Sequence, residues 1–78
     1  MSEDNRIRHD IVDKAGRITL RFAGQMRYLG IGRAWIGTPT LTVISGTQAT
    51  TTNRDTGEVI AEHDLNPSRR YQPNQLNR

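Results

Sequence analysis

Hydrophobic and polar residues alternate most regularly in one six-residue run, Arg-Ile-Thr-Leu-Arg-Phe, which begins at Arg17. Successive side chains of a β-strand point to opposite faces, so Ile18, Leu20 and Phe22 would share one face of a strand. Arg17 and Arg21 would lie on the other face. The apolar face needs a core to cover it, and the two guanidinium groups need water or an anionic partner. We therefore expect this strand to contribute both to the core and to a binding surface.

The rest of the chain divides into short segments of similar length, separated by turns that contain glycine. No segment keeps a sustained 3.6-residue period, so we expect no helix of useful length. The fold class is therefore predicted to be all-β, a small antiparallel barrel of five or six short strands, because closure leaves few sheet edges exposed. The expected strands are 6–12, 17–22, 26–31, 38–45, 48–53 and 58–65.

The same alternation predicts which side chains of the later strands enter the core. In the third expected strand the apolar residues change parity, and we expect Leu29 and Ile31 inside and Tyr28 at least partly exposed. The fourth expected strand is rich in β-branched residues, and we expect its core face to carry Leu41 and Val43.

Turn signals predict how these strands are connected. The run Asp-Lys-Ala-Gly at 13–16 combines an Asp that can open a turn with a Gly that tolerates positive φ, so the first two strands should form a hairpin. Gly46-Thr47 and the run Arg-Asp-Thr-Gly at 54–57 are further turns, the second of them a hairpin turn.

The two ends differ in composition from the centre. Residues 1–5 are polar and are expected to form a flexible N-terminus. Residues 67–78 consist mostly of Asn, Pro, Ser, Arg and Gln, which bury too little apolar surface to fold alone, so we expect a flexible, disordered C-terminal tail. The barrel would then be a single domain spanning 6–66.

The charge is basic: eleven Lys and Arg against eight Asp and Glu give a net charge of +3, and every basic residue except Lys14 is Arg. The planar guanidinium suits phosphate and guanine edges, although a GC-rich genome would equally enrich Arg. The chain has no Cys, no signal-peptide core and no apolar run near the ~20 residues of a membrane span. We therefore expect a cytoplasmic protein with no membrane contact.

Catalytic chemistry finds no support in the residue pattern. His9 and His63 are far apart, and each stands beside an Asp that would point to the opposite face of its strand, so no metal site is expected. The Ser and Thr residues lack a recognisable base, and Gly30-Ile31-Gly32 precedes no helix that could bind phosphate. We expect no enzyme activity, no cofactor and no small-molecule substrate.

Six short runs carry a recognisable pattern: Arg8-His9-Asp10, 13–21, 29–34, 55–58, 64–67 and 70–73. Together they resemble the C-terminal barrel of actinobacterial insertion-sequence transposases of the retroviral-integrase type, over roughly residues 6–73. The resemblance implies an SH3-like barrel that helps to hold DNA, with the catalytic residues in an upstream domain that this chain lacks. It implies that Arg17 and Arg21 form a basic strand face and that Arg33 adds a positive charge in the glycine-bounded loop. Trp35 and His63 depart from the pattern, and His63 leaves the register of the last strand open.

The resulting hypothesis is a non-catalytic domain that binds double-stranded DNA with low sequence specificity. Arg17, Arg21 and Arg27 would form a patch on adjacent strands together with Arg33. Arg69 and Arg70 in the flexible tail would add a second set of DNA contacts. Trp35 could stack on a base or a sugar. The candidate DNA-binding residues are Arg17, Arg21, Arg27, Arg33, Trp35, Arg69 and Arg70.

Other interpretations stay open at this point. The Arg face could be an ordinary solvated surface, partly paired with Asp10 and Asp13. Trp35 and Ile36 could cap one end of the barrel. The domain could instead be a protein-interaction barrel that contacts transposase subunits or forms a homodimer through Trp35, Ile36 and Tyr28, or a folded remnant of a decayed mobile element.

Overall fold

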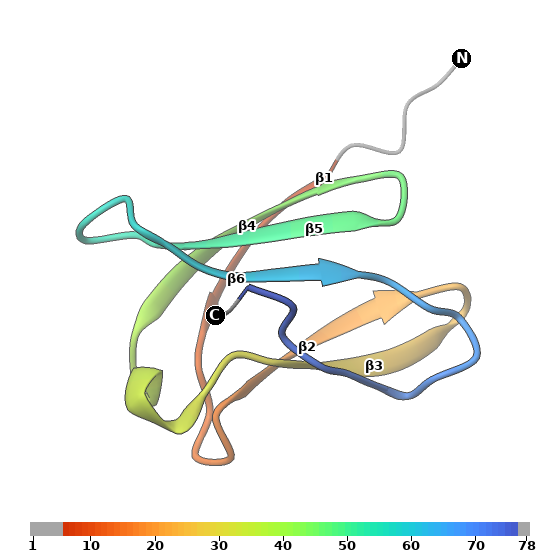
Figure 1. Cartoon of the computed structure of the whole chain (residues 1–78), viewed down its shortest axis with the longest axis horizontal. Helices are drawn as coiled ribbons and strands as arrows, with labels where there is room; N and C mark the ends of the chain where they lie inside the picture. The colour runs from red at the N-terminus through yellow and green to blue at the C-terminus, as the bar shows by residue number, and fades with distance from the viewer. Residues whose placement is uncertain (1–5, 77–78) are drawn as a thin grey trace.

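The computed structural model describes residues 6–76. It contains short strands, a single 3₁₀ turn η1 (Arg33–Trp35), and no α-helix in this part of the chain (Figure 1). The predicted all-β class is therefore confirmed, and the flexible N-terminus expected at residues 1–5 lies outside the described residues. The strands are β1 (Arg6–Ile11), β2 (Arg17–Phe22), β3 (Gln25–Gly30), β4 (Pro39–Ser45), β5 (Gln48–Asn53), β6 (Val59–Asp64) and β7 (Tyr71–Gln72).

The strands form two sheets. The first has the order β1-β4-β5-β6 and is antiparallel throughout, and the second has the order β2-β3-β7. In the second sheet β2 and β3 are antiparallel, and β7 runs parallel to β3. Figure 1 shows β2 and β3 on one side of the molecule and β4 and β5 on the other. The β4–β5 and β5–β6 pairs confirm the turns predicted around Gly46 and at 54–57.

The hairpin predicted between the first two strands is not formed. The turn itself exists, because the Asp13 carboxylate accepts the N–H groups of Ala15 and Arg17 at 2.9 and 3.0 Å. The strands on either side of it then enter different sheets: β1 pairs with β4, and β2 pairs with β3. The predicted turn is formed, but long-range pairing with β4 decides where β1 lies.

The core face of β4 is also the opposite of the predicted one. Val43 is 44% exposed and Leu41 is half-buried, while Thr40 and Thr42 point inward and are fully buried. Buried hydroxyls need partners, and these have them: Thr40 Oγ1 donates to a backbone oxygen of β1 at 3.1 Å, and Thr42 Oγ1 lies 3.0 Å from Thr51 Oγ1. The threonines can therefore occupy the core, and the apolar Leu and Val face outward.

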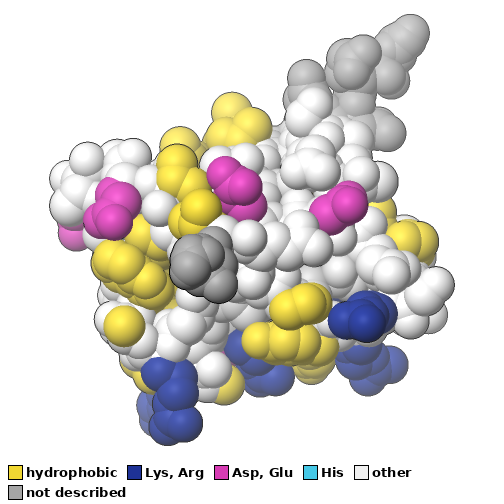
Figure 2. Space-filling view, viewed as in Figure 1, with side chains coloured by type: hydrophobic (Ala, Val, Ile, Leu, Met, Phe, Trp, Pro, Cys, Tyr) yellow, Lys and Arg dark blue, Asp and Glu magenta, His cyan; other side chains and the backbone are white. Residues whose placement is uncertain are grey.

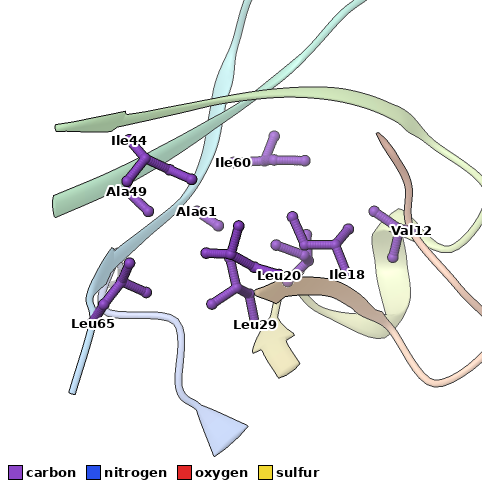
Figure 3. Packing of buried hydrophobic residues seen from close by; sticks show 10 residues of the cluster. Val12, Ile18, Leu20, Leu29, Ile44, Ala49, Ile60, Ala61 and Leu65 are labelled. Carbon is purple, nitrogen blue, oxygen red and sulfur yellow. The ribbon is translucent and has the colours of Figure 1, made fainter. Parts of the chain in front are cut away.

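The core lies between the two sheets. Ile18 and Leu20 from β2 and Leu29 from β3 point toward residues of β4, β5 and β6 (Figure 3). These placements and that of Ile31 confirm the predicted inward faces, and Phe22 packs against the cluster while remaining partly exposed. The buried hydrophobic residues are Val12, Ile18, Leu20, Leu29, Ile31, Ile44, Ala49, Ile60, Ala61 and Leu65.

The described part of the expected tail, 67–76, is built into the fold. β7 pairs with β3, and the Gln72 side chain is only 2% exposed. Its amide nitrogen donates to the carbonyls of Asn66 and Arg69 at 2.9 and 2.6 Å, and its oxygen accepts the Asn66 N–H at 2.9 Å. The expectation of a disordered tail is wrong for this segment. Hydrogen bonds of polar side chains fix it to the rest of the chain, although it buries little apolar surface.

Two polar side chains join β6 to the loop after β3 and to β3 itself. Asn74 Nδ2 donates to the carbonyl oxygens of Ile31 and Ile60 at 3.3 and 3.2 Å. His63 is 1% exposed, and its Nε2 lies 2.9 Å from the carbonyl oxygen of Gly30. This places His63 on the inner face of β6 and settles the register that the sequence left open.

Candidate nucleic-acid interface

The candidate site is the outer face of the β2-β3-β7 sheet, which points away from the core. Ile18 and Leu20 point inward from β2, so Arg17 and Arg21 point outward. In the adjacent strands Tyr28 pairs with Tyr71, and both belong to the same outward face. We call Arg17, Arg21, Tyr28 and Tyr71 the basic–aromatic face.

Arg17 is stacked on an aromatic ring in this face. Its guanidinium carbon lies 4.3 Å from the centre of the Tyr28 ring, a distance typical of a cation–π contact. The contact follows from the register: Thr19 is directly opposite Tyr28, so Arg17 is its diagonal neighbour. Arg17 Nε is 3.8 Å from Asp13 Oδ2, too far for a hydrogen bond. Asp13 therefore forms a long ion pair with Arg17 but no hydrogen bond.

Tyr71 completes the aromatic part of the face. Its ring lies across Gly30, and a Cβ on Gly30 would collide with the phenol group. Gly30 faces Arg17 in the β2–β3 register, so the Tyr71 ring lies close to the base of the Arg17 side chain. Tyr71 is 49% exposed, which leaves about half of the side chain available to a partner.

Arg21 stands at the other end of β2 and is exposed, with no ion pair to any residue within 6–76. Arg6 lies beside it, because Arg6 Nη2 donates to the backbone carbonyl of Arg21 at 2.9 Å. Arg6 was not among the predicted site residues. Its strand belongs to the other sheet, so no local pattern in the sequence could bring the two together.

Arg27 does not belong to this face, contrary to the prediction. It is directly opposite Leu20 and shares the inner side of β3 with Leu29, and it is only 4% exposed. Its Nε donates to the carbonyl of Phe22 at 3.1 Å, and its Nη1 donates to the carbonyl of Arg69 at 3.2 Å. Arg27 therefore links the β2–β3 turn to the segment before β7 and is not placed for phosphate contact.

Arg33 and Trp35 lie in η1, near the start of β2. The carbonyl of Gly16 accepts the N–H groups of Ile31 and Gly32 at 2.8 and 3.0 Å, which places exposed Arg33 near the Arg17 end of the basic–aromatic face. Gly16 has a φ of +77°, and a Cβ there would crowd the backbone of Gly32 and Arg33, so a larger residue would be strained. Trp35 is partly buried against the core, which agrees with the interpretation of a barrel cap.

Arg69 and Arg70 are exposed and immediately precede β7. The N–H of Tyr28 donates to the carbonyl of Arg70 at 2.8 Å, so this pair is fixed beside β3 and is not carried on a free tail. The structure thus brings Arg69 and Arg70 to the same sheet as Arg17 and Arg21.

Charge is distributed unevenly around the molecule. No Asp or Glu occurs between Asp13 and Asp55 or after Asp64, so the strands β2, β3 and β7 and the loops that join β2 to β3 and β6 to β7 contain no carboxylate. In Figure 2 the Lys and Arg side chains gather along the lower side, where β2 and β3 lie in Figure 1, and the Asp and Glu side chains lie higher. A surface of one charge sign attracts a polyanion from a distance.

Other kinds of site are not formed by the described residues. Among residues 6–76 no group of three His, Asp or Glu side chains is arranged to hold a metal ion. An open hollow of about 410 Å³ lies beside the chain before β7 and is lined mainly by polar residues between Asp64 and Gln75. In the same part of the chain, no helix has the length and apolar character needed to cross a bilayer.

Comparison with known proteins found no protein-family model, no curated protein and no solved structure that matches the chain. The resemblance to transposase barrels therefore stays a prediction from the sequence motifs, and the case for a function depends on the geometry of the basic–aromatic face.

Proposed function

We propose that the chain is a non-catalytic domain that binds double-stranded DNA through the basic–aromatic face, in the manner implied by its resemblance to integrase-type transposase barrels. The observation that carries the proposal is a carboxylate-free sheet whose outer face presents Arg17 and Arg21. Arg17 is stacked on Tyr28, and its ion pair with Asp13 spans 3.8 Å without a hydrogen bond, so its N–H groups stay available to a phosphate.

The expected binding is mainly electrostatic. Arg17 and Arg21 are four residues apart on one strand, which separates them by about 13 Å and allows them to contact different phosphates. Arg33 extends the surface beyond the Arg17 end, and Arg69 and Arg70 extend it beside β3, just before β7 begins. Phosphate contacts position a protein on DNA but do not read bases, so we expect low sequence specificity.

The test is fluorescence anisotropy of a labelled duplex over a series of salt concentrations. Each phosphate contact contributes about 0.9 to the slope of log affinity against log salt. The double variant Arg17→Ala/Arg21→Ala should therefore bind more weakly and lower the slope by about 2. Arg54→Ala is the matched control, because Arg54 is exposed in the β5–β6 turn, outside the β2-β3-β7 sheet.

The proposal fails if wild-type affinity does not weaken with salt, or if the Arg54 variant loses as much affinity as the double variant. A folded chain with no measurable affinity for a duplex would favour the interpretation of a remnant without present binding activity.

A further inference from the structure

β1 is the edge strand of the four-stranded sheet. It pairs only with β4, so one side of its backbone has no partner strand in the described chain. The N–H of Val12 donates to the carbonyl of Thr38, and the carbonyl of Val12 accepts the N–H of Gly37, so residue 12 directs both groups to the side of β4, toward the segment that leads into it. Backbone groups alternate sides along a strand, so those of Ile7, His9 and Ile11 point to the free edge.

The side chains of this edge are apolar on the outer face of the sheet. Ile7 and Ile11 are each 66% exposed, the largest values among the exposed large hydrophobic residues. Val43 is directly opposite Ile7 on β4 and is 44% exposed. Exposure is therefore greatest on the side where a neighbouring strand is missing, and an unprotected edge of this kind is a template for pairing.

We propose that this edge pairs with the β1 edge of a second copy of the chain, antiparallel and around a two-fold axis at His9. In this register Ile7 lies opposite Ile11 of the second copy, Arg8 lies opposite Asp10, and His9 lies opposite His9. Within residues 7–11 the isoleucines of the two copies then meet each other, and each Arg8 meets an Asp10. The two four-stranded sheets become one continuous sheet.

The sequence of β1 selects this register over its neighbours. A shift by two residues centres the pair on Arg8 or on Asp10 and places like charges directly opposite each other, which destabilises a pair. A shift by one residue would put the isoleucines of the two copies on opposite faces of the sheet. The central register alone matches both charge and face, and this self-complementarity identifies a second copy as the partner.

The carboxylate of Asp10 also favours a second copy of the chain as the partner. Its Oδ2 is buried and has no hydrogen-bond partner among the described residues, and its Oδ1 accepts only a long 3.4 Å bond from Arg8 Nη2. Buried carboxylate oxygens normally have donors. Arg8 of the second copy would stand directly opposite Asp10 and supply them. The interface lies on the other sheet from the basic–aromatic face, so it does not depend on the proposed DNA binding.

The test is sedimentation of the full chain over a concentration series, with charge-reversed variants. Arg8→Asp places carboxylates opposite each other in the pair, and Asp10→Arg does the same with guanidinium groups. Each variant should associate with itself at least about tenfold more weakly than the wild type. An equimolar mixture of the two variants should associate again, because every pair in the mixed dimer is of opposite charge.

Val59→Thr is the matched control, because Val59 is also exposed on this sheet but lies on β6, at the opposite edge. It should leave association unchanged, while Ile7→Thr and Ile11→Thr should weaken it, and these variants also serve if charge reversal prevents folding. Amide NMR spectra establish that each variant is folded. A wild type that stays monomeric at every concentration overturns the proposal. So does a mixture that does not associate, or a dimer that Val59→Thr weakens as much as Ile7→Thr.

Discussion

The guanidinium of Arg17 lies over the ring of Tyr28, with 4.3 Å between the guanidinium carbon and the ring centre. An isolated surface Arg loses rotamer freedom when it binds a phosphate, at a cost of about 1 kcal/mol or more. Stacking restricts Arg17 before any ligand arrives, so less freedom remains to be lost. The Tyr28 ring would thus help binding by orienting a charge, even without touching DNA.

This relationship predicts a difference between two substitutions of Tyr28. Tyr28→Phe keeps the ring and should leave DNA affinity within about twofold of the wild type. Tyr28→Ala removes the ring and should weaken binding several-fold, corresponding to about 0.5–1 kcal/mol, while the salt slope stays the same because no phosphate contact is lost. Anisotropy titrations measure both quantities. Equal losses in the two variants would show that the hydroxyl, and not the stack, is what matters.

A second prediction concerns the close approach of Tyr71 to Gly30. Gly30→Ala should destabilise the fold by about 1–3 kcal/mol, because the new methyl group collides with the Tyr71 ring and forces β7 away from β3. Combining it with Tyr71→Ala removes the collision, so the double variant should be less destabilised than the sum of the single variants. Urea unfolding of the four proteins gives the coupling energy. Strict additivity would mean that the ring moves aside without cost.

Part of this arrangement could be predicted from the sequence. Alternation in β2 and β3 predicted the inward faces of Ile18, Leu20 and Leu29, because local periodicity and burial agree there. The same parity rule, applied from Leu29 back to Arg27, would have placed Arg27 inside as well. The predicted patch on adjacent strands placed Arg27 outside, and its hydrogen bonds to two carbonyls make the buried position possible.

The remaining differences arise from long-range pairing. β4 inverts its expected face because the hydroxyls of Thr40 and Thr42 find partners on other strands, a backbone carbonyl of β1 and the hydroxyl of Thr51, which a local pattern of Leu and Val does not reveal. Tyr71 enters the candidate site only because β7 pairs with β3 across more than forty residues of chain. In the sequence, the signal for this contact was a single glycine, Gly30, inside a strand, which can mark the close approach of another group.

A third prediction follows from His63. Burial lowers the pKa of its imidazole below the usual 6.5, and the hydrogen bond to the Gly30 carbonyl opposes this shift only in part. The unfolded chain therefore takes up a proton near pH 6.5 while the folded chain does not. Stability should be complete above that pH and should fall as the pH is lowered from 6.5 toward the lowered pKa of the folded state.

The measurement is the free energy of unfolding at several pH values for the wild type, His63→Gln and His9→Gln. One titrating group changes this energy by at most about 1.4 kcal/mol per pH unit. His63→Gln should remove the part of the acid dependence that belongs to His63, whatever its effect on overall stability. At protein concentrations where the chain is monomeric, His9 is exposed and faces no second copy, so His9→Gln is the matched control and should keep the wild-type profile. The reverse pattern would show that the imidazole of His63 titrates normally.

The last prediction separates structural from binding arginines. Arg27→Met keeps much of the buried stem but removes the donors to the carbonyls of Phe22 and Arg69, so we expect a loss of about 1–3 kcal/mol in unfolding free energy. The slope of DNA affinity against salt should stay at the wild-type value, because Arg27 makes no phosphate contact in this arrangement. Arg17→Ala should show the opposite combination, a stability change below about 1 kcal/mol and a slope lower by about 0.9. If Arg27→Met lowered the slope instead, its guanidinium would have to leave the two carbonyls on binding, and the DNA-facing surface would extend to the β2–β3 turn.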